Sequence, residues 1–227
     1  MASGSSGPTE DLGTLTDVEP LKRAWRNEKA APEILRYETH LIYRVSKQIE
    51  LLEGTVDDFT EDGVDPLMIS LYQMDLDRIQ FLLRSYLRIR LQKIEKYMFH
   101  LLLKKQEFHE KLSKEEKAFV QRCAEDMKKH LDESVLSHLP KNYQSILKQF
   151  TTVEEDDAEV DDMVPEPPLD TFVVCIAREY VGPSEFQDSS SDSLAMDLPL
   201  EMEPGDLSFI PYRRIKKLLE SRKVDLV

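Results

Sequence analysis

A long amphipathic run spans residues 66–106 and reads PLMISLYQMDLDRIQFLLRSYLRIRLQKIEKYMFHLLLKKQ. Apolar side chains recur in it at intervals of three or four residues, which predicts one long helix. These side chains cover more than one narrow stripe of that helix: Leu71, Met74, Leu76, Ile79, Leu82, Leu83, Tyr86, Leu87, Ile89, Leu91, Ile94, Tyr97, Met98, Leu101 and Leu102. A helix that is apolar on two faces lies at the centre of its domain or buries its second face in another chain.

Two helical patterns precede this run. Residues 21–34, LKRAWRNEKAAPEI, contain good helix formers, and Pro32 predicts a break or a new first turn. A second helix is expected from Pro32 to Glu53 and is expected to end at Gly54. The acidic residues 55–66 (TVDDFTEDGVDP) then predict a loop before the long helix.

Two more helical patterns follow the long run. Ser113 and Glu116 have the spacing of a capping box, which predicts the start of a helix that continues to Leu131. Residues 143–150, YQSILKQF, form a shorter amphipathic piece after Pro140. Up to Phe150 the sequence thus predicts five or six helices and no strand.

The pattern changes in the last third of the chain. Residues 151–168, TTVEEDDAEVDDMVPEPP, combine like charges with prolines, which predicts an extended linker. Residues 171–178 (TFVVCIAR) and 207–212 (LSFIPY) have strand composition, with a Ser/Asp-rich loop at 189–193 between them. The end, RRIKKLLESRKVDLV, predicts a short basic helix and a terminal strand.

These patterns predict a mainly α protein with a small β-rich C-terminal domain. The expected parts are a flexible tail at 1–20, a helical-bundle domain at 21–150, the linker at 151–168 and the β-rich domain at 169–227. A domain as short as the last one buries little core by itself and is expected to need a partner surface.

Composition restricts the function. The chain has 227 residues, 41% of them hydrophobic, and a net charge of −14, which argues against a protein whose whole surface binds nucleic acid. Seven glycines leave little room for phosphate-binding loops, and two separated cysteines support neither a disulfide framework nor a zinc site. With no signal peptide and no apolar run of spanning length, a soluble intracellular protein is expected.

Catalytic and metal-binding patterns find no support in the sequence. His40, His100, His109, His130 and His138 have no spacing that presents two imidazoles to one metal from a helix. Asp75 and Asp77 point to different sides of the long helix and are expected to be solvated or paired with cations. We therefore predict no catalytic residue, no metal and no cofactor.

Basic residues on the long helix leave an alternative open. Arg78, Arg84, Arg88, Arg90, Lys93, Lys96, Lys104 and Lys105 face few acids, and tyrosines lie between them. A nucleic-acid-binding module using residues 78–105 is one interpretation. Ion pairing within the chain or between subunits is favoured, because the rest of the chain is strongly acidic.

Two segments carry a family resemblance. SYLRIRLQKIEKY (85–97) and NEKAAPEIL (27–35) resemble the signature segments of the SLD-five family of subunits of the eukaryotic GINS complex. The order of features is similar too, with PPLDTFVVCIA (167–177) opening the small domain after an acidic linker. The resemblance covers residues 21–227 and is strongest in the first two segments.

The resemblance implies a non-catalytic role in DNA replication. GINS is a heterotetramer of related subunits, each with a helical A domain and a β-rich B domain. It joins the MCM ring and a RecJ-like partner to form the active replicative helicase, and it supports initiation and elongation and a connection to DNA polymerase epsilon. The expected partners are these proteins and three sister subunits, in the nucleus. DNA contact is expected to be at most indirect or weak, and no membrane is expected.

The resemblance also implies a set of functional residues. Subunit-interface or core positions are Trp25, Asn27, Glu28, Lys29, Pro32, Tyr86, Leu87, Arg88, Arg90, Leu91, Lys93, Ile94, Glu95, Lys96 and Tyr97. Their charged members are expected to form ion pairs that fix subunit register, and Trp25 is the expected anchor. The small domain's core or docking face is expected to contain Phe172, Val173, Val174, Ile210, Tyr212, Ile215, Leu218, Val224 and Leu226. Leu12 and Leu15 match loosely a tail that binds a trimeric polymerase-alpha adaptor in some relatives; a solvated tail is the alternative.

Overall fold

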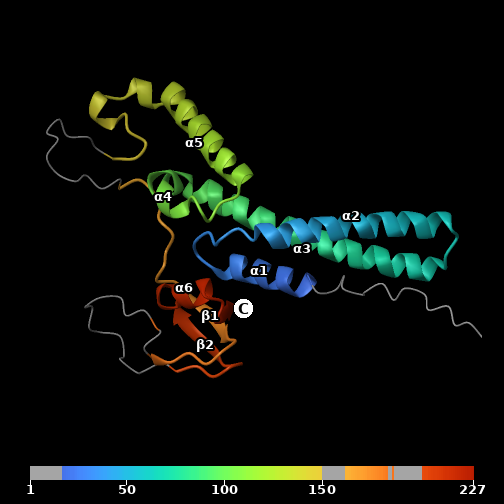
Figure 1. Cartoon of the computed structure of the whole chain (residues 1–227). Coiled ribbons are helices and arrows are strands. Elements are labelled where there is room, and N and C mark those ends of the chain that lie inside the picture. Colours follow the sequence, from blue (N-terminus) through green and yellow to red (C-terminus); the bar gives the residue numbers. More distant parts are fainter. Residues whose placement is uncertain (1–16, 150–161, 184–185, 187–200) are drawn as a thin grey trace, which may run out of the picture. The chain divides into compact units, whose positions relative to one another are not determined.

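The structure is a computed structural model that describes residues 17–149, 162–183, 186 and 201–227 (Figure 1). Leu12 and Leu15, most of the expected linker and the Ser-rich tract lie outside these residues. The described chain forms six α-helices and three strands. It divides into two compact units, one of residues up to Trp25 with Glu38–Ser85, the other of Arg26–Tyr37 with Tyr86–Val227.

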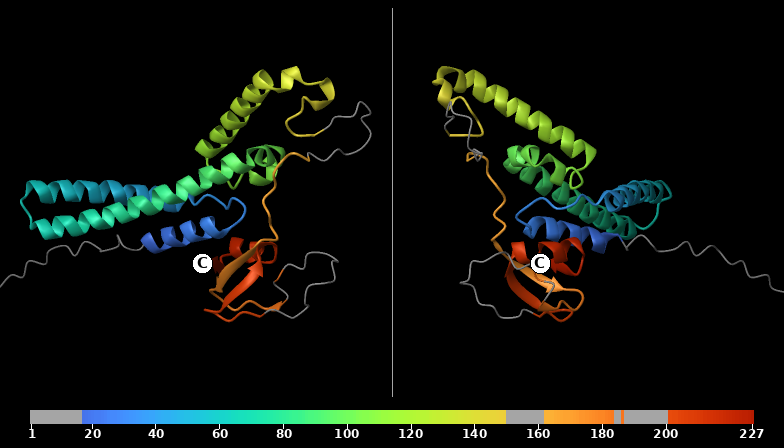
Figure 2. Two further views of the ribbon diagram at one scale, coloured as in Figure 1. Left: turned by 180° about the vertical axis from the view of Figure 1, so that it is seen from behind. Right: turned by 60° about the vertical axis from the view of Figure 1, so that its left-hand side comes forward.

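The first unit is built on a helical hairpin. Helix α2 (Thr39–Glu61) and residues 66–85 of helix α3 (Pro66–Leu103) lie side by side in Figure 1 and in both views of Figure 2. The first residues of helix α1 (Val18–Ala30) also belong to this unit. Its buried apolar side chains recur at helical spacing: Val18, Leu21, Leu41, Ile42, Val45, Val56, Leu76, Ile79 and Leu82. The amphipathic pattern of these segments therefore matches the side chains that are buried.

The expected end of the second helix at Gly54 is wrong. Helix α2 begins only at Thr39 and continues through Gly54 to Glu61, so most of the expected loop at 55–66 is helical. A glycine inside a helix costs only about 1 kcal/mol. Burial of Val56 and an edge-to-face contact of Phe59 with Tyr72, with ring centroids 5.3 Å apart, offset that cost.

The helical part of the second unit surrounds a small apolar core. It contains residues 86–103 of α3, the short helix α4 (Lys105–Phe108) and helix α5 (Lys114–Ser134). The capping box of Ser113 and Glu116 is present at the start of α5, as predicted. The core residues are Ile34, Ile94, Tyr97, Leu101, Phe108 and Val120. At Tyr97 the backbone (φ −115°, ψ 20°) departs from helical geometry and kinks α3.

The shorter helix expected at residues 143–150 is not formed in the part of it that the structure describes. Two 3-10 turns, Leu136–His138 and Lys141–Tyr143, follow α5. Residues 144–149 then run as bends without regular structure. Ile146 and Leu147 are half-buried, so the apolar residues that suggested a helix pack without forming one.

The C-terminal part of the second unit is a three-stranded antiparallel sheet with one helix. Strand β1 (Phe172–Ala177) lies between β2 (Leu207–Pro211) and β3 (Val224–Leu226), and helix α6 (Tyr212–Glu220) follows β2 directly. Alternate residues of β1 point to opposite faces, so Val173, Cys175 and Ala177 are buried. They share a core with α6, β3 and Ala31, the residue that follows α1.

This architecture confirms the predicted fold class, mainly α with a small β-rich C-terminal part. The predicted strands at 171–178 and 207–212 and the final helix and strand are all present. Within the described ranges, no helix is both long and apolar enough to cross a membrane.

Candidate subunit interface

Arg90 lies in the middle of the stretch SYLRIRLQKIEKY (85–97) and is fully buried, with 0% of its surface exposed. Its Nε and Nη2 donate to the two carboxylate oxygens of Glu116, at 2.7 and 2.9 Å. Its Nη1 donates to Glu28 at 2.9 Å and to the carbonyl of Leu35 at 2.8 Å, and Nη2 also donates to the carbonyl of Lys111 at 3.0 Å. All five N–H groups of the guanidinium are therefore satisfied inside the chain.

Lys93 completes a charge-balanced cluster with Arg90. Its Nζ donates to Glu28 Oε1 at 2.8 Å, to the carbonyl of Glu33 at 2.8 Å and to the carbonyl of Glu28. Burial lowers the pKa of Lys93, although the charge and the hydrogen bond of Glu28 act to raise it. Burial also acts to lower the pKa of Arg90, but its hydrogen bond to Glu116 and the charge of Glu28 outweigh this and raise it. Two cations and two carboxylates thus meet with no excess charge, as a buried cluster requires.

Aromatic rings cover the guanidinium of Arg90. Its Cζ lies 5.3 Å from the ring centroid of Tyr37 and 5.7 Å from that of Tyr86. These are cation–π distances, and the two rings are themselves 6.5 Å apart. Burial and then the charge of Glu116 raise the pKa of Tyr37.

A second cluster forms around Glu33, in the bend after α1. Its carboxylate accepts hydrogen bonds from the Tyr212 hydroxyl at 2.9 Å and from Lys216 Nζ at 3.0 Å, both on α6. Lys111 Nζ lies 3.5 Å away. Asn27 adds a contact to the terminal strand, since its side-chain oxygen accepts from the backbone N–H of Leu226 at 2.7 Å. Residues 27–33 therefore hold α6 and β3 by specific polar contacts.

These contacts divide the α3 motif into two faces. Tyr86, Arg90, Ile94 and Tyr97 are buried. Arg88, Leu91, Glu95 and Lys96 are exposed, and Leu87 is half-buried. Leu87 and Leu91 are one helical turn apart and so lie on the same outward side. The outward face of the motif is the part that another chain can reach.

Trp25 and Pro32 are both half-buried. The Nε1 of Trp25 donates to Ser85 Oγ at 2.9 Å, within the first unit. The indole thus has a hydrogen bond of its own, while part of its ring stays accessible. Of the other residues in the same segment, Glu28 is buried and Lys29 is exposed.

Large apolar side chains are exposed along the α2–α3 hairpin. They are Tyr43, Leu51, Leu67, Met68, Leu71, Met74 and Phe81. Scattered exposed apolar residues are ordinary on a protein surface, but this hairpin exposes an unusual number of large ones.

The outer face of the C-terminal sheet is also apolar. Phe172 and Val174 of β1 are 53% and 41% exposed, and Leu207 and Phe209 of β2 are 64% and 66% exposed. Val174 pairs directly with Phe209, and the rings of Phe172 and Phe209 lie 5.1 Å apart. These side chains form a continuous patch, the outer sheet patch, on the side opposite the core.

Comparison with known proteins agrees with this picture of a subunit. The family of the GINS complex protein helical bundle domain matches residues 45–135, and that of the DNA replication complex GINS protein SLD5 C-terminus matches residues 167–227. A relative from Arabidopsis thaliana, named DNA replication complex GINS protein SLD5, is 54% identical over 99% of this chain and 97% of its own. The chain belongs to the SLD5 family of GINS proteins.

Other SLD5 proteins are similar over the full length of the chain. Relatives of the same name from Homo sapiens and Dictyostelium discoideum are 31% and 27% identical, each over 100% of this chain and 97% and 100% of their own. The resemblance predicted from the two motif segments is thereby confirmed.

The residues predicted for the small domain of this SLD5-family chain fall into two groups, one buried and one exposed. Val173, Ile210, Tyr212, Ile215, Leu218, Val224 and Leu226 are buried in its core. Phe172 and Val174 instead lie in the outer sheet patch. Adjacent strand residues face opposite sides, so the predicted set contains a core half and a surface half.

The basic residues of α3 do not form a single accessible stripe. Arg90 is enclosed, and Lys93 is mostly so. Lys104 lies 3.3 Å from Glu166, Arg78 lies 3.9 Å from Asp75, and the Nζ of Lys96 lies 5.1 Å from the centre of the Tyr97 ring. Arg84, Arg88 and Lys105 are exposed. Arg90 and Lys93 are thus withdrawn from any face that could bind phosphate.

The five histidines do not come together as a set of metal ligands in the described structure. His100 is buried, with its Nδ1 3.4 Å from Glu166, and the other four are exposed. In the part of the chain that the structure describes, no group of three or more His, Cys, Asp or Glu side chains is placed to hold a metal ion.

Sequence reasoning missed three residues of the buried clusters. Glu33, Glu116 and Lys111 were not among the predicted interface or core residues, although Glu33 lies inside the segment NEKAAPEIL. Glu116 was assigned only a capping role. A signal for Glu33 was available, because it is the one charged residue in the apolar stretch 30–35 (AAPEIL), and a buried acid requires a cation.

Proposed function

We propose that this chain is a non-catalytic structural subunit of a four-subunit GINS complex and that packed surfaces, not turnover, are its contribution to DNA replication. The observation that carries the proposal is the row of exposed large apolar side chains on the α2–α3 hairpin. Their burial against sister subunits would remove an apolar surface that a lone soluble protein rarely exposes.

The buried clusters support an architectural role. Arg90 and Lys93 pair with Glu28 of α1 and Glu116 of α5 inside the chain. These residues therefore fix the relation of α1, α3 and α5 rather than act on a substrate. The outer sheet patch offers a second apolar surface for a sister subunit. The outward members of the α3 motif, Leu87 and Leu91, offer a third.

Membership of the SLD5 family supports a proposal for the wider assembly. The complex would join the MCM ring and a RecJ-like partner as the active replicative helicase in the nucleus, and would connect it to DNA polymerase epsilon. Residues 21–150 would act as the helical domain, 151–168 as a linker and 169–227 as the small domain. Leu12 and Leu15 would contact a trimeric polymerase-alpha adaptor.

Light scattering after gel filtration tests the proposal directly. The chain is expressed alone and together with its three sister subunits, each at low and at high salt. A complex of one copy of each subunit that resists high salt is expected, since apolar interfaces do not weaken as phosphate contacts do. A stable monomer that ignores the sister subunits would overturn the proposal.

A matched pair of variants locates the interface. Phe81→Asp places a charge on an exposed apolar position of the hairpin, and Ser70→Asp places the same charge on an exposed polar position of the same helix. Only Phe81→Asp is expected to abolish the complex, because only that charge would be buried. If the two variants form the complex equally well, the exposed apolar side chains of the hairpin are not part of a subunit interface.

A further inference from the structure

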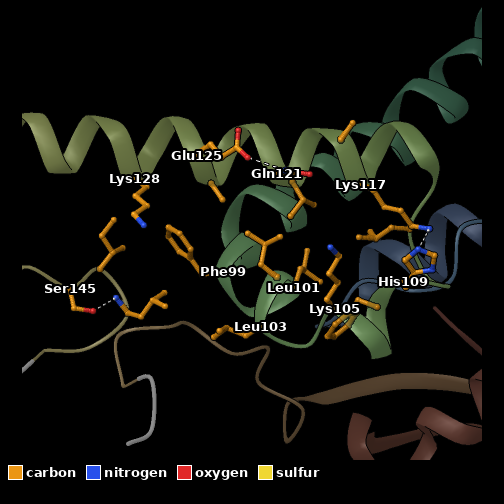
Figure 3. Close-up of a pocket in the computed structure, with 18 of the residues that line it drawn as sticks. Phe99, Leu101, Leu103, Lys105, His109, Lys117, Gln121, Glu125, Lys128 and Ser145 are labelled. Carbon is orange, nitrogen blue, oxygen red and sulfur yellow. Dashed lines mark hydrogen bonds between the residues drawn. The ribbon is translucent and has the colours of Figure 1, made fainter. Parts of the chain in front are cut away.

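A hollow of about 790 Å³ lies in the second unit between the end of α3, helix α5 and residues 144–147 (Figure 3). Its floor consists of the core residues Leu101, Phe108 and Val120. Leu102 and Leu103 also line it and are 37% and 49% exposed. The hollow is therefore apolar inside and continues onto an apolar surface.

Three lysines line this apolar hollow, Lys105, Lys117 and Lys128, against two acids, Glu125 and Asp132. Figure 3 shows Lys128 reaching down from α5 and Lys105 reaching up toward α5, whereas Glu125 turns back to Gln121, which donates a hydrogen bond to it at 3.0 Å. Neither Lys105 nor Lys128 forms an ion pair with any residue that the structure describes. These three lysines form a positive rim around the hollow, which is unusual on a chain with a net charge of −14.

The shape of the hollow restricts what can bind. Its walls are helices and irregular chain, so it offers no sheet edge to which an extended peptide could add a strand. It also lacks the buried, convergent polar groups that orient a small cofactor. An apolar groove between helices is the usual receptor for the apolar face of an amphipathic helix.

We propose that this groove binds an acidic amphipathic helix of a partner protein outside the four-subunit complex. Leucine or phenylalanine side chains of that helix enter the hollow, and its carboxylates face Lys105, Lys117 and Lys128. The charged rim favours an exchangeable partner, because permanent subunit interfaces are larger and more apolar. This docking site goes beyond the proposed assembly, which does not require it.

A phage-displayed library of random 16-residue peptides provides the probe. It is selected on the immobilised four-subunit complex that contains this chain, and the enriched peptides are synthesised with a fluorescent label. We expect enriched sequences with apolar residues at i, i+3 or i+4, and i+7, together with two or more Asp or Glu residues. No enrichment, or enrichment without acidic residues, would overturn the proposal.

Paired variants assign the binding to the groove. Lys128→Glu is expected to weaken the best peptide at least tenfold in fluorescence anisotropy. Lys129→Glu removes a neighbouring lysine that lies outside the hollow, near Glu133, and is expected to change affinity less than twofold. Leu102→Ser is likewise compared with Met127→Ser, an exposed α5 residue that does not line the hollow. Equal effects within either pair would overturn the assignment.

The assembly state is read in parallel for every variant. Light scattering shows whether each complex keeps its four subunits, so a failure of assembly is distinguished from a failure of the groove. A peptide that binds the chain alone but not the complex would show that a sister subunit covers the groove, and this would also overturn the proposal.

Discussion

The hydroxyl of Tyr212 donates a hydrogen bond of 2.9 Å to Glu33, which lies 179 positions earlier in the chain. Both side chains are buried, and Tyr212 is the first residue of α6. Burial, and then the charge of Glu33, raise the pKa of Tyr212, so the hydroxyl stays protonated and continues to donate. Together with the hydrogen bond from Lys216 to Glu33, this contact ties the bend after α1 to the small C-terminal domain.

Tyr212→Phe is expected to destabilise the chain by about 1–3 kcal/mol, because Glu33 would lose a donor while remaining buried. Urea unfolding of the chain, followed by circular dichroism, measures this. Tyr180→Phe serves as the control, since Tyr180 is exposed and its change is expected to stay within about 0.5 kcal/mol. A Tyr212→Phe chain as stable as the original would mean that the contact contributes nothing.

Arg90→Met is expected to cost about 3–5 kcal/mol, because it leaves the carboxylate of Glu116 buried without its cation and leaves Glu28 with Lys93 alone. Arg90→Lys is expected to recover only part of this loss, since an ammonium cannot reproduce the bidentate pairing with Glu116. Arg88→Met, two residues away on the exposed side, is the control in the same unfolding measurement. Similar losses for Arg88 and Arg90 would contradict the assignment of the buried cluster.

His100 predicts a dependence of stability on pH. Burial first, and then the charge of Lys104, lower its pKa below 6.5, while Glu166 and Glu107 act in the opposite direction. As pH falls below 6.5, the unfolded chain binds the proton first, so this residue's contribution to stability is lost on acidification. His100→Asn is therefore expected to lose less stability than the original chain between about pH 6.5 and pH 5. His109→Asn, at an exposed histidine, is expected to follow the original chain, and identical pH profiles for all three proteins would refute the assignment.

Leu87→Asp is expected to abolish assembly with the sister subunits. Leu87 is half-buried on the outward face of the α3 motif, so a neighbouring subunit would bury the new charge without a partner. Gln92→Asp places the same charge at an exposed polar position on this helix and is expected to assemble normally. Recovery of an intact tetramer that contains Leu87→Asp would show that no sister subunit covers the outward face of the α3 motif.

Local signals made much of the fold predictable. The helix from Pro66 and the start of α5 follow from periodicity and from the capping box of Ser113 and Glu116, which involve neighbours in sequence. The course of α2 through Gly54 was not predictable in this way, because contacts with α3 decide it.

The buried clusters were less predictable than the helices. Arg90 finds Glu28 62 residues away, and Tyr212 finds Glu33 179 residues away. Nothing in the local pattern pairs these side chains, so an arginine on an amphipathic helix could equally have faced a sister subunit. The sequence motif marked Arg90 as important without identifying its partners.

The outer sheet patch gives the most direct test of how the small domain docks. Phe209→Ser removes the most exposed aromatic side chain of the patch, and because that side chain is outside the core, the chain itself is expected to unfold at nearly the same urea concentration. If a sister subunit covers the patch, the variant is expected to assemble at least tenfold more weakly, since burial of an aromatic side chain contributes about 1.5–3 kcal/mol. Tyr180→Ser alters an exposed aromatic residue outside the patch and is expected to leave assembly unchanged. Titration of the sister subunits onto each chain, read by light scattering, separates the two cases. Unchanged assembly of Phe209→Ser would show that the sister subunits leave this face of the sheet uncovered.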